Sequence, residues 1–388
     1  MTTKQSTIND VARLAGVSKA TVSAVLNDTG TVKRSTRERV LSVIESLNYR
    51  KSGPDRRSTG QQVRSLALVI KEIDNPFYGE VITGARAAAD EAGYTLLVMS
   101  TEGGHEAERR AVELLQRKEV DGLILTPVLD ADADLSHLFE LKRRNFPFVL
   151  LEEVRGVPGS LIDVDNEAAS RKAVEFLIGQ GHTRIVHFAG PGYSSHSQER
   201  IDGVRRACSG SHVIFTDHDV VRAGAHLEDG YRTGLEYFRE RPAAERPTAV
   251  TCYNDLVAIG LCRALAELGL SVPGDVSVIG FDDIALLDYL PLRLTTVRMP
   301  KGEMGRLAAQ LLIRHIESRE AVPPEKVYLE AELVVRDSTR ALAGPVAERP
   351  VLVRVASGDG RTSGDGRTGG DGTGATDGAR RTLSPASR

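Results

Sequence analysis

The chain has 388 residues, with 50 Lys and Arg against 53 Asp and Glu, a formal net charge of −3 and only three cysteines. No apolar run is long enough to span a bilayer, and the widely spaced cysteines form neither a metal knuckle nor a disulfide framework. The near-neutral total hides an asymmetry, because residues 1–64 carry twelve basic and five acidic side chains. A basic head on an acidic body is expected when only the head meets DNA.

Residues 7–50 predict three short helices. We expect Thr7 to open the first helix, Gly16 to end it with a positive φ, Ser18 to cap the second, and Ser35 or Thr36 to cap the third. Apolar side chains at helical spacing then form a small core: Ile8, Val11, Ala12, Ala15, Val22, Val25, Leu26, Val40, Leu41, Ile44 and Leu47. This pattern is typical of a helix-turn-helix.

The exposed side of the second helix carries Lys19, Ala20, Thr21 and Ser23, which are small or cationic. A helix with such a side can enter the major groove, since nothing bulky or acidic blocks the phosphates and base edges. The competing interpretation is a three-helix domain whose charges are merely solvated. Turn, caps and charge together favour the DNA-binding interpretation.

Residues 65–340 alternate short apolar runs with amphipathic helices, which predicts parallel sheets covered on both faces. The expected strands are 66–70, 95–100, 122–126, 148–152, 184–189, 212–216, 248–253 and 276–282. The expected helices are 77–93, 106–118, 167–180, 198–207, 229–239 and 256–268. Because this is more than one compact sheet needs, we predict two doubly wound parallel-sheet subdomains.

Polar side chains follow several of these strands, at the edge where ligands of open α/β sheets bind. They lie in the segments 74–78, 163–165, 190–200, 254–255 and 282–283. Carboxylates, amides and an Arg beside aromatic rings suit a hydroxyl-rich small molecule. Each Asp or Asn alone is equally well explained as a helix cap, so the prediction depends on their repetition.

The head and the motifs NPFY (75–78), VDNEAA (164–169), YND (253–255), VIGFDD (278–283) and LTTVRMP (294–300) resemble the LacI/GalR family of transcriptional regulators. The resemblance runs from about Thr7 to about Thr339. It implies a helix-turn-helix head, a short hinge and a core like that of periplasmic sugar-binding proteins. It also implies a homodimer on a pseudo-palindromic operator, with a small effector in the interdomain cleft that changes operator affinity.

Carried over by position, the resemblance implies two sets of contacts. In the head, Lys19, Ala20 and Ser23 would face bases, and Thr21 and Asn27 would contact phosphate or end the helix. The DNA-contact set as a whole comprises Thr7, Ser18, Lys19, Ala20, Thr21, Ser23, Ala24, Asn27, Arg56 and Arg57. The effector set comprises Asn75, Phe77, Asp165, Ser194, His196, Arg200, Asn254 and Asp282.

The chain departs from the family pattern in the head and the hinge. Ala24 stands where many members carry Arg. The hinge RKSGPDRRSTGQQ (50–62) contains Gly53 and Pro54 and no Leu, so a hinge helix is not expected. Arg56 and Arg57 can still enter a narrow minor groove, and we predict weaker operator bending than is usual in the family.

The cleft departs too, because Ala223, Gly224 and Ala225 are small where an aromatic often stacks on the effector. Ser194 and His196 stand where purine-sensing members carry other polar groups. These departures favour a sugar or sugar-like polyol over a purine.

The tail from 341 to 388 repeats a GDGRT-like unit with almost no apolar residues, which predicts disorder. Its acidic spacing does not match a calcium loop. It carries no leucine heptads, so we expect a dimer and not a tetramer held by a coiled coil.

The predicted organisation is therefore a DNA-binding head at 1–50, a hinge at 51–64, an effector-binding core at 65–340 and a tail at 341–388.

No nucleophile–base pair, phosphate loop or metal-ligand spacing is found in the sequence, so we expect neither an enzyme nor a cofactor or metal. We interpret His182 and His187 as ordinary buried or surface histidines. Without a leader segment the protein is expected in the cytoplasm, on the nucleoid. Two functions stay open: an effector-responsive operator-binding repressor, and a ligand sensor whose head makes only non-specific DNA or protein contacts.

Overall fold

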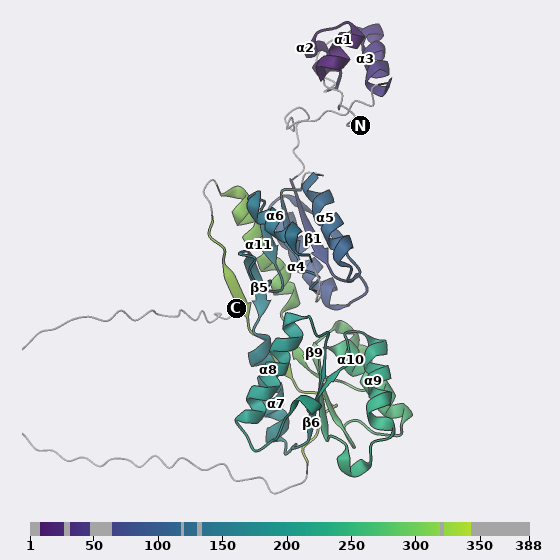
Figure 1. Cartoon of the computed structure of the whole chain (residues 1–388), viewed down its shortest axis with the longest axis vertical. Helices are drawn as coiled ribbons and strands as arrows, with labels where there is room; N and C mark the ends of the chain where they lie inside the picture. Colours follow the sequence, from purple (N-terminus) through teal and green to yellow (C-terminus); the bar gives the residue numbers. More distant parts are fainter. Residues whose placement is uncertain are drawn as a thin grey trace, which may run out of the picture. The chain divides into compact units, whose positions relative to one another are not determined.

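The computed structural model describes residues 8–26, 32–46, 64–117, 120–129, 134–318 and 322–342 (Figure 1). They form a three-helix head and a core built on two sheets. The predicted hinge up to residue 63, the tail from residue 343, and the individual residues Thr7, Asn27, Leu47, Arg56 and Arg57 lie outside the described residues. Among the helices that are described, none is both long and apolar enough to cross a membrane.

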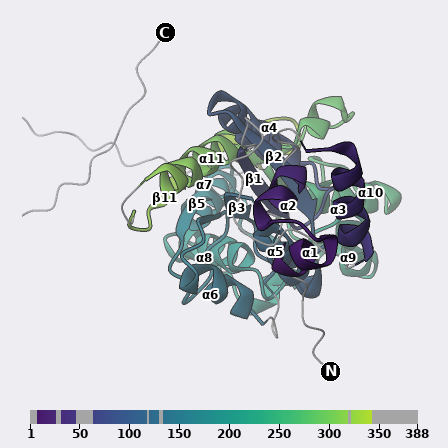
Figure 2. The same ribbon diagram turned by 90° about the horizontal axis from the view of Figure 1, so that it is seen from above.

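The head consists of α1 (Ile8–Ala15), α2 (Lys19–Leu26) and α3 (Arg34–Ser46), which pack against one another (Figure 2). Gly16 has a φ of +62°, so the predicted left-handed turn is confirmed. The Val17 amide donates to the carbonyl of Ala12 at 3.0 Å and closes α1. Ser18 Oγ accepts from the amide of Thr21 at 3.1 Å, which confirms it as the cap of α2.

The core of the head agrees with the prediction except in α3. The side chains of Val11, Ala15, Val22, Val25 and Val40 are buried together. Leu41, which was expected to join them, is 49% exposed.

The predicted cap of α3 is also wrong. The amide of Arg37 donates to the carbonyl of Lys33 at 3.0 Å, so α3 already begins at Arg34. Ser35 and Thr36 therefore lie inside its first turn. Val43 and Ile44 pack on the core in place of Leu41 because they lie three and four residues after Val40, on the same face of the helix.

The first sheet of the core has the strand order β11-β5-β4-β3-β1-β2, and all neighbours are parallel. Its strands are β1 (Arg64–Ile70), β2 (Tyr94–Ser100), β3 (Gly122–Leu125), β4 (Phe148–Leu150), β5 (Ser160–Val164) and β11 (Lys326–Leu329). The helices α4 (Phe77–Glu91) and α11 (Lys301–Glu317) cover one face, and α5 (His105–Arg117) and α6 (Ser136–Arg143) cover the other (Figure 1).

The second sheet has the order β12-β10-β9-β8-β6-β7, in which only β12 runs antiparallel, against β10. Its strands are β6 (Ile185–Ala189), β7 (Val220–Arg222), β8 (Ala249–Cys252), β9 (Ser277–Asp282), β10 (Thr295–Arg298) and β12 (Glu332–Val334). The helices α7 (Asn166–Gly179) and α8 (Ser195–Ser209) cover one face, and α9 (Leu227–Arg239) and α10 (Asp255–Glu267) the other. Short 3₁₀ turns occur at Asp217–Asp219, Ala243–Glu245 and Ala285–Tyr289. The prediction of two doubly wound parallel-sheet subdomains is confirmed.

One predicted strand, at 212–216, is wrong. Its amides bond to nearby side chains instead of a ladder: the Val213 amide donates to Ser211 Oγ at 3.1 Å, and the Thr216 amide to Asp219 at 2.7 Å. The edge strand beside β6 is instead β7, which begins at Val220, four residues after the end of the predicted strand. The strands β5, β7, β10, β11 and β12 lie outside the eight predicted runs.

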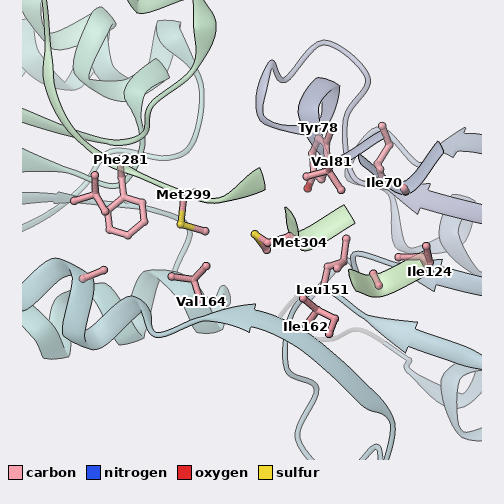
Figure 3. Close-up of a cluster of buried hydrophobic side chains, with 14 of the residues drawn as sticks. Ile70, Tyr78, Val81, Ile124, Leu151, Ile162, Val164, Phe281, Met299 and Met304 are labelled. Carbon is pink, nitrogen blue, oxygen red and sulfur yellow. The ribbon is translucent and has the colours of Figure 1, made fainter. Parts of the chain in front are cut away.

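The chain passes between the two sheets three times: between β5 and α7, between β10 and α11, and between β11 and β12. Buried apolar side chains of both subdomains meet around these crossings in one cluster, in which Val164 and Met299 lie near Met304 and Leu151 (Figure 3). The crossings join the carboxyl end of one sheet to that of the other. Polar side chains that follow the strands of both sheets are thereby brought to one place.

Close packing of α4 against α11 depends on glycine. A Cβ on Gly305 would lie 2.0 Å from the carbonyl oxygen of Val81, whereas a Cβ on Gly79 would meet nothing within 4 Å. We therefore expect Gly305→Ala to lower the free energy of unfolding by about 2 kcal/mol. Gly79→Ala in the same helix pair should raise it by up to about 1 kcal/mol, because alanine favours the helix. Urea unfolding measures both, and equal effects of one sign would contradict this account of the packing.

Candidate functional site

A cavity of about 580 Å³ lies between the carboxyl ends of the two sheets. The first subdomain contributes side chains that follow β1, β3 and β4, and the second contributes those that follow β6, β7, β8 and β9. Aromatic and polar groups share the wall, with Phe77 and Tyr78 from α4 and Tyr253 after β8. A cavity of this size and lining fits a small molecule that has both hydroxyl groups and an apolar face.

Seven of the eight predicted effector residues line this cavity. They are Asn75, Phe77, Ser194, His196, Arg200, Asn254 and Asp282. The eighth, Asp165, lies outside the lining and is exposed. Its carboxylate accepts from the amide of Ala168 at 2.9 Å and caps α7, which is the alternative role that Asp residues have after strands.

Three of the lining residues also organise helix starts. Asn254 accepts from the Val257 amide at 2.9 Å and donates to the carbonyl of Ala225 at 2.8 Å. Ser194 Oγ caps α8, and Asn75 Oδ1 accepts from the Phe77 amide at 3.1 Å. Capping and cavity lining therefore coincide at these positions, and the caps hold the side chains in fixed orientations.

Arg200 lies on α8, and its side chain lines the cavity on the side of the second subdomain. Its guanidinium stacks 3.6 Å from the centroid of Phe281 and 4.8 Å from that of Tyr253. Nε donates to Asn166 Oδ1 at 3.0 Å, and Nη1 donates to the Tyr253 carbonyl. A guanidinium held on both faces and at its edge keeps one orientation, which preorganises it for a ligand.

A buried ion pair that sequence reasoning missed forms part of the cavity wall. Lys71, directly after β1, pairs with Glu152, two residues after the end of β4, and Ser195 Oγ donates to the other Glu152 oxygen at 2.8 Å. Burial raises the pKa of the Glu152 carboxyl, but the charges of Lys71 and His196 outweigh it and lower this pKa to about 2. The charged residues at the ends of the runs LALVIK and FVLLE were a signal for this pair.

His196 links the subdomains through a second buried pair, since its Nε2 lies 3.1 Å from Asp163 Oδ2 at the end of β5. Burial lowers the pKa of the imidazole, but the carboxylates of Asp163 and Glu152 outweigh burial and raise it to about 9. His196 is thus a cation at neutral pH. A third link closes the rim, where His226 contacts Glu72 at 3.0 Å and Asp229 at 3.1 Å.

Asp282 and Asp283 have different surroundings. Asp282 lines the cavity, and burial raises the pKa of its carboxyl to about 6 against the opposing charges of Arg200 and Lys301. Asp283 instead pairs with Arg298 and Arg336, each at 2.7 Å. The two residues have φ values of +113° and +55°. Lys301 holds this turn by donating Nζ to both carbonyl oxygens, at 2.6 and 2.8 Å.

His182 and His187 are buried and bond to threonines, as expected of histidines without a metal. The distances are 2.9 Å from His182 to Thr248 and 2.9 Å from His187 to Thr251. Within the part of the chain that the structure describes, no group of three potential ligands is arranged to hold a metal ion.

The predicted DNA-contact face is open on α2. Ser18, Lys19 and Ala20 are exposed, Thr21, Ser23 and Ala24 are half-buried, and Val22 and Val25 point into the core. Charge and shape on this face match what a recognition helix needs at the major groove.

A helix-turn-helix together with a two-sheet core around a polar cavity defines a DNA-binding transcriptional regulator with a ligand-binding domain. Family models agree on both parts. Residues 7–52 match the model for bacterial regulatory proteins of the lacI family, and residues 174–339 match a periplasmic binding protein-like domain. The chain belongs to the lacI family of bacterial regulatory proteins.

Relatives and solved structures support the same assignment. The chain is 33% identical over 340 residues to the HTH-type transcriptional repressor PurR of Vibrio vulnificus (strain CMCP6), and 32% identical over 339 residues to the HTH-type transcriptional regulator DegA of Bacillus subtilis (strain 168). Each alignment covers 87% of this chain and 99% of the relative.

Among solved structures, the complex of the transcriptional regulator CelR with cellobiose is 30% identical in sequence to this chain, with a TM-score of 0.64. The match covers 86% of this chain and the whole of the CelR chain. The lac repressor dimer bound to operator and the anti-inducer ONPF is 27% identical in sequence, with a TM-score of 0.65. That match covers 87% of this chain and the whole of the lac repressor chain. These relatives are transcriptional regulators and not enzymes.

Proposed function

We propose that this protein is a repressor whose two copies bind an operator through their heads, and whose operator affinity changes when a small carbohydrate-like effector occupies the cavity. The observation that carries the proposal is one cavity lined from both subdomains, in a chain that also has an open recognition helix. A repressor of this kind acts in the cytoplasm, on the nucleoid. A dimer is supported by the lac repressor, which is a dimer in its operator complex.

The lining favours a polyol. Asn75, Asn254 and Asp282 offer hydrogen-bond donors and acceptors, and Phe77 and Tyr253 offer ring faces. Ala223 and Ala225 leave room on the wall of the second subdomain. The complex of CelR with cellobiose supports a carbohydrate, as a property of that regulator.

The effector acts, in this proposal, by binding one relative arrangement of the subdomains better than another. A ligand that bonds to Asn75 of the first subdomain and to Asp282 of the second gains both contacts only when the two walls are at the correct separation. The difference in affinity between the two arrangements sets the largest change in operator affinity that the effector can produce.

DNA recognition is tested on Lys19, which is exposed at the start of α2. We expect Lys19→Gln to weaken binding to the operator about tenfold, because a charged contact to a base edge or phosphate is lost. Lys172→Gln, which removes the same charge from the exposed side of α7, should leave binding unchanged. Fluorescence anisotropy with labelled duplex measures both variants, and equal affinities for wild type and Lys19→Gln would contradict the placement of α2 in the groove.

The effector is tested by thermal shift of the full chain against sugars, nucleosides and amino acids. A ligand at 100 times its Kd stabilises the folded state by about 2.7 kcal/mol, which raises the melting temperature measurably. Stabilisation by nucleosides and not by sugars would contradict the carbohydrate class.

The alternative function is a sensor whose head binds DNA without sequence preference. This alternative predicts equal affinity for upstream and random duplexes.

A further inference from the structure

The carboxylates that line the cavity are almost all paired already. Glu152 pairs with Lys71, Glu72 with His226, and Asp229 with both His226 and Arg232. Asp282 alone among the lining carboxylates has no ion pair with a described residue, and it lies near the guanidinium of Arg200. An incoming ligand therefore meets one available carboxylate, which suits hydroxyl groups.

Arg222 is a lining cation that, like Arg200, has no ion pair with a described residue. It is the last residue of β7, it lines the cavity and it is exposed. Nη1 donates to the Gly190 carbonyl and to Ser197 Oγ, both at 3.3 Å, which is long for a bond from a charged donor. No carboxylate among the described residues forms an ion pair with it. Arg222 and the small side chain of Ala223 both line the cavity.

The surroundings of Arg222 add positive charge. Of the two groups that it touches, Gly190 directly follows β6, and Ser197 lies in the first turn of α8, a 15-residue helix whose first amides carry partial positive charge. His196, in the first turn of α8, lines the cavity and is cationic, although Asp163 balances its charge. The wall near Ser197 therefore combines the Arg222 guanidinium with the partial positive charge of the helix start, beside the carboxylates of Glu152 and Asp163, which are already paired. An anionic group placed there gains a charge-assisted hydrogen bond without facing an unpaired carboxylate.

We propose that the effector carries an anionic group, a carboxylate or a phosphate, which binds Arg222 at the start of α8 while its hydroxyl groups bind Asp282 and Asn254. The effector class is then a sugar acid or a sugar phosphate and not a neutral sugar. This inference rests on the proposed function of the cavity and names the chemistry of its ligand.

The test is a thermal-shift titration of the full chain with matched probes at constant ionic strength. Gluconate and glucuronate carry a carboxylate, glucose 6-phosphate carries a phosphate, and glucose and glucitol are their neutral counterparts. Inorganic phosphate measures the effect of the anion alone. We expect at least one of the anionic probes to bind at least tenfold more tightly than its neutral counterpart and than inorganic phosphate. Comparison of the carboxylates with the phosphate shows which anion the site takes.

Variants locate the anion. Arg222→Gln should weaken binding of the anionic probe about 10- to 100-fold, the size of one lost hydrogen bond to a charged group. Arg239→Gln removes the same charge from an exposed position of α9 outside the lining and should leave binding unchanged. Failure of every anionic probe to bind, or equal binding to wild type and Arg222→Gln, overturns the inference. Tight binding of a neutral sugar that Arg222→Gln does not alter also overturns it, but leaves the proposed function intact.

Discussion

Between pH 6.5 and about pH 8.5 the wild-type protein will lose about 2 kcal/mol more of its free energy of unfolding than a His196→Gln variant loses. The folded state raises the pKa of His196 from 6.5 to about 9, chiefly through Asp163 and Glu152, which overcome the effect of burial. A raised pKa means that the folded state holds the proton more tightly. This stabilisation is complete below pH 6.5 and disappears as the pH rises through 9.

Other histidines do not obscure this window. His182, His187 and His315 have lowered pKa values because burial disfavours their charged forms, so above pH 6.5 they are largely neutral in the folded state. The last of their deprotonation in the unfolded state adds slightly to stability as the pH rises, and it does so equally in wild type and in His196→Gln. His226 has a raised pKa because Glu72 and Asp229 outweigh its burial, but its ring is about half exposed and solvent screens the effect. Urea unfolding at several pH values measures the slope. A wild-type stability that does not change across this window would contradict the buried His196–Asp163 pair.

Lys301→Met will lower the free energy of unfolding by about 3 kcal/mol. Lys301 is 2% exposed, and its Nζ donates to the carbonyl oxygens of Asp282 and Asp283 and contacts Glu80 at 3.2 Å. Methionine fills nearly the same volume but leaves both carbonyl groups without this donor. Because both aspartates have positive φ, the turn that places Asp282 in the cavity also loses its support.

Glu80→Gln is the matched control for that variant. The Glu80 side chain is about half exposed, so its contact with Lys301 is worth less than 1 kcal/mol. The same urea unfolding measurement compares the two variants. If Lys301→Met is as mild as Glu80→Gln, the lysine does not hold the turn. Since Lys301 begins α11 and Glu80 lies on α4, the lysine also joins the floor of the cavity to the first subdomain.

The location of the polar residues that follow the strands was predictable, because a parallel sheet brings the carboxyl ends of all its strands to one edge. The order of polar residues after the apolar runs was therefore enough to place Asn75, Asn254 and Asp282 around one cavity. The same reasoning misplaced Asp165, since a cap and a ligand contact use the same residue type at the same position. Local sequence cannot separate these two roles.

Tertiary partners were not predictable. Lys71 and Glu152 are separated by 81 positions, and only the pairing of β1, β3 and β4 brings their side chains together. Arg222 ends a strand of three residues that was missed, because the apolar run at 212–216 suited a strand better by composition. That run failed because neighbouring Ser211 and Asp219 side chains capture its amides.

The central claim is that an operator-reading head and an effector cavity belong to one switch. Its most direct test is fluorescence anisotropy of the full chain on the DNA upstream of its own gene and on a shuffled duplex, at physiological salt, with and without a ligand found by thermal shift. We predict binding to one upstream segment about 1,000-fold or more tighter than to the shuffled duplex, and a change of about fivefold or more when the ligand saturates the cavity. Equal affinity for both duplexes, unaffected by the ligand, would contradict the account.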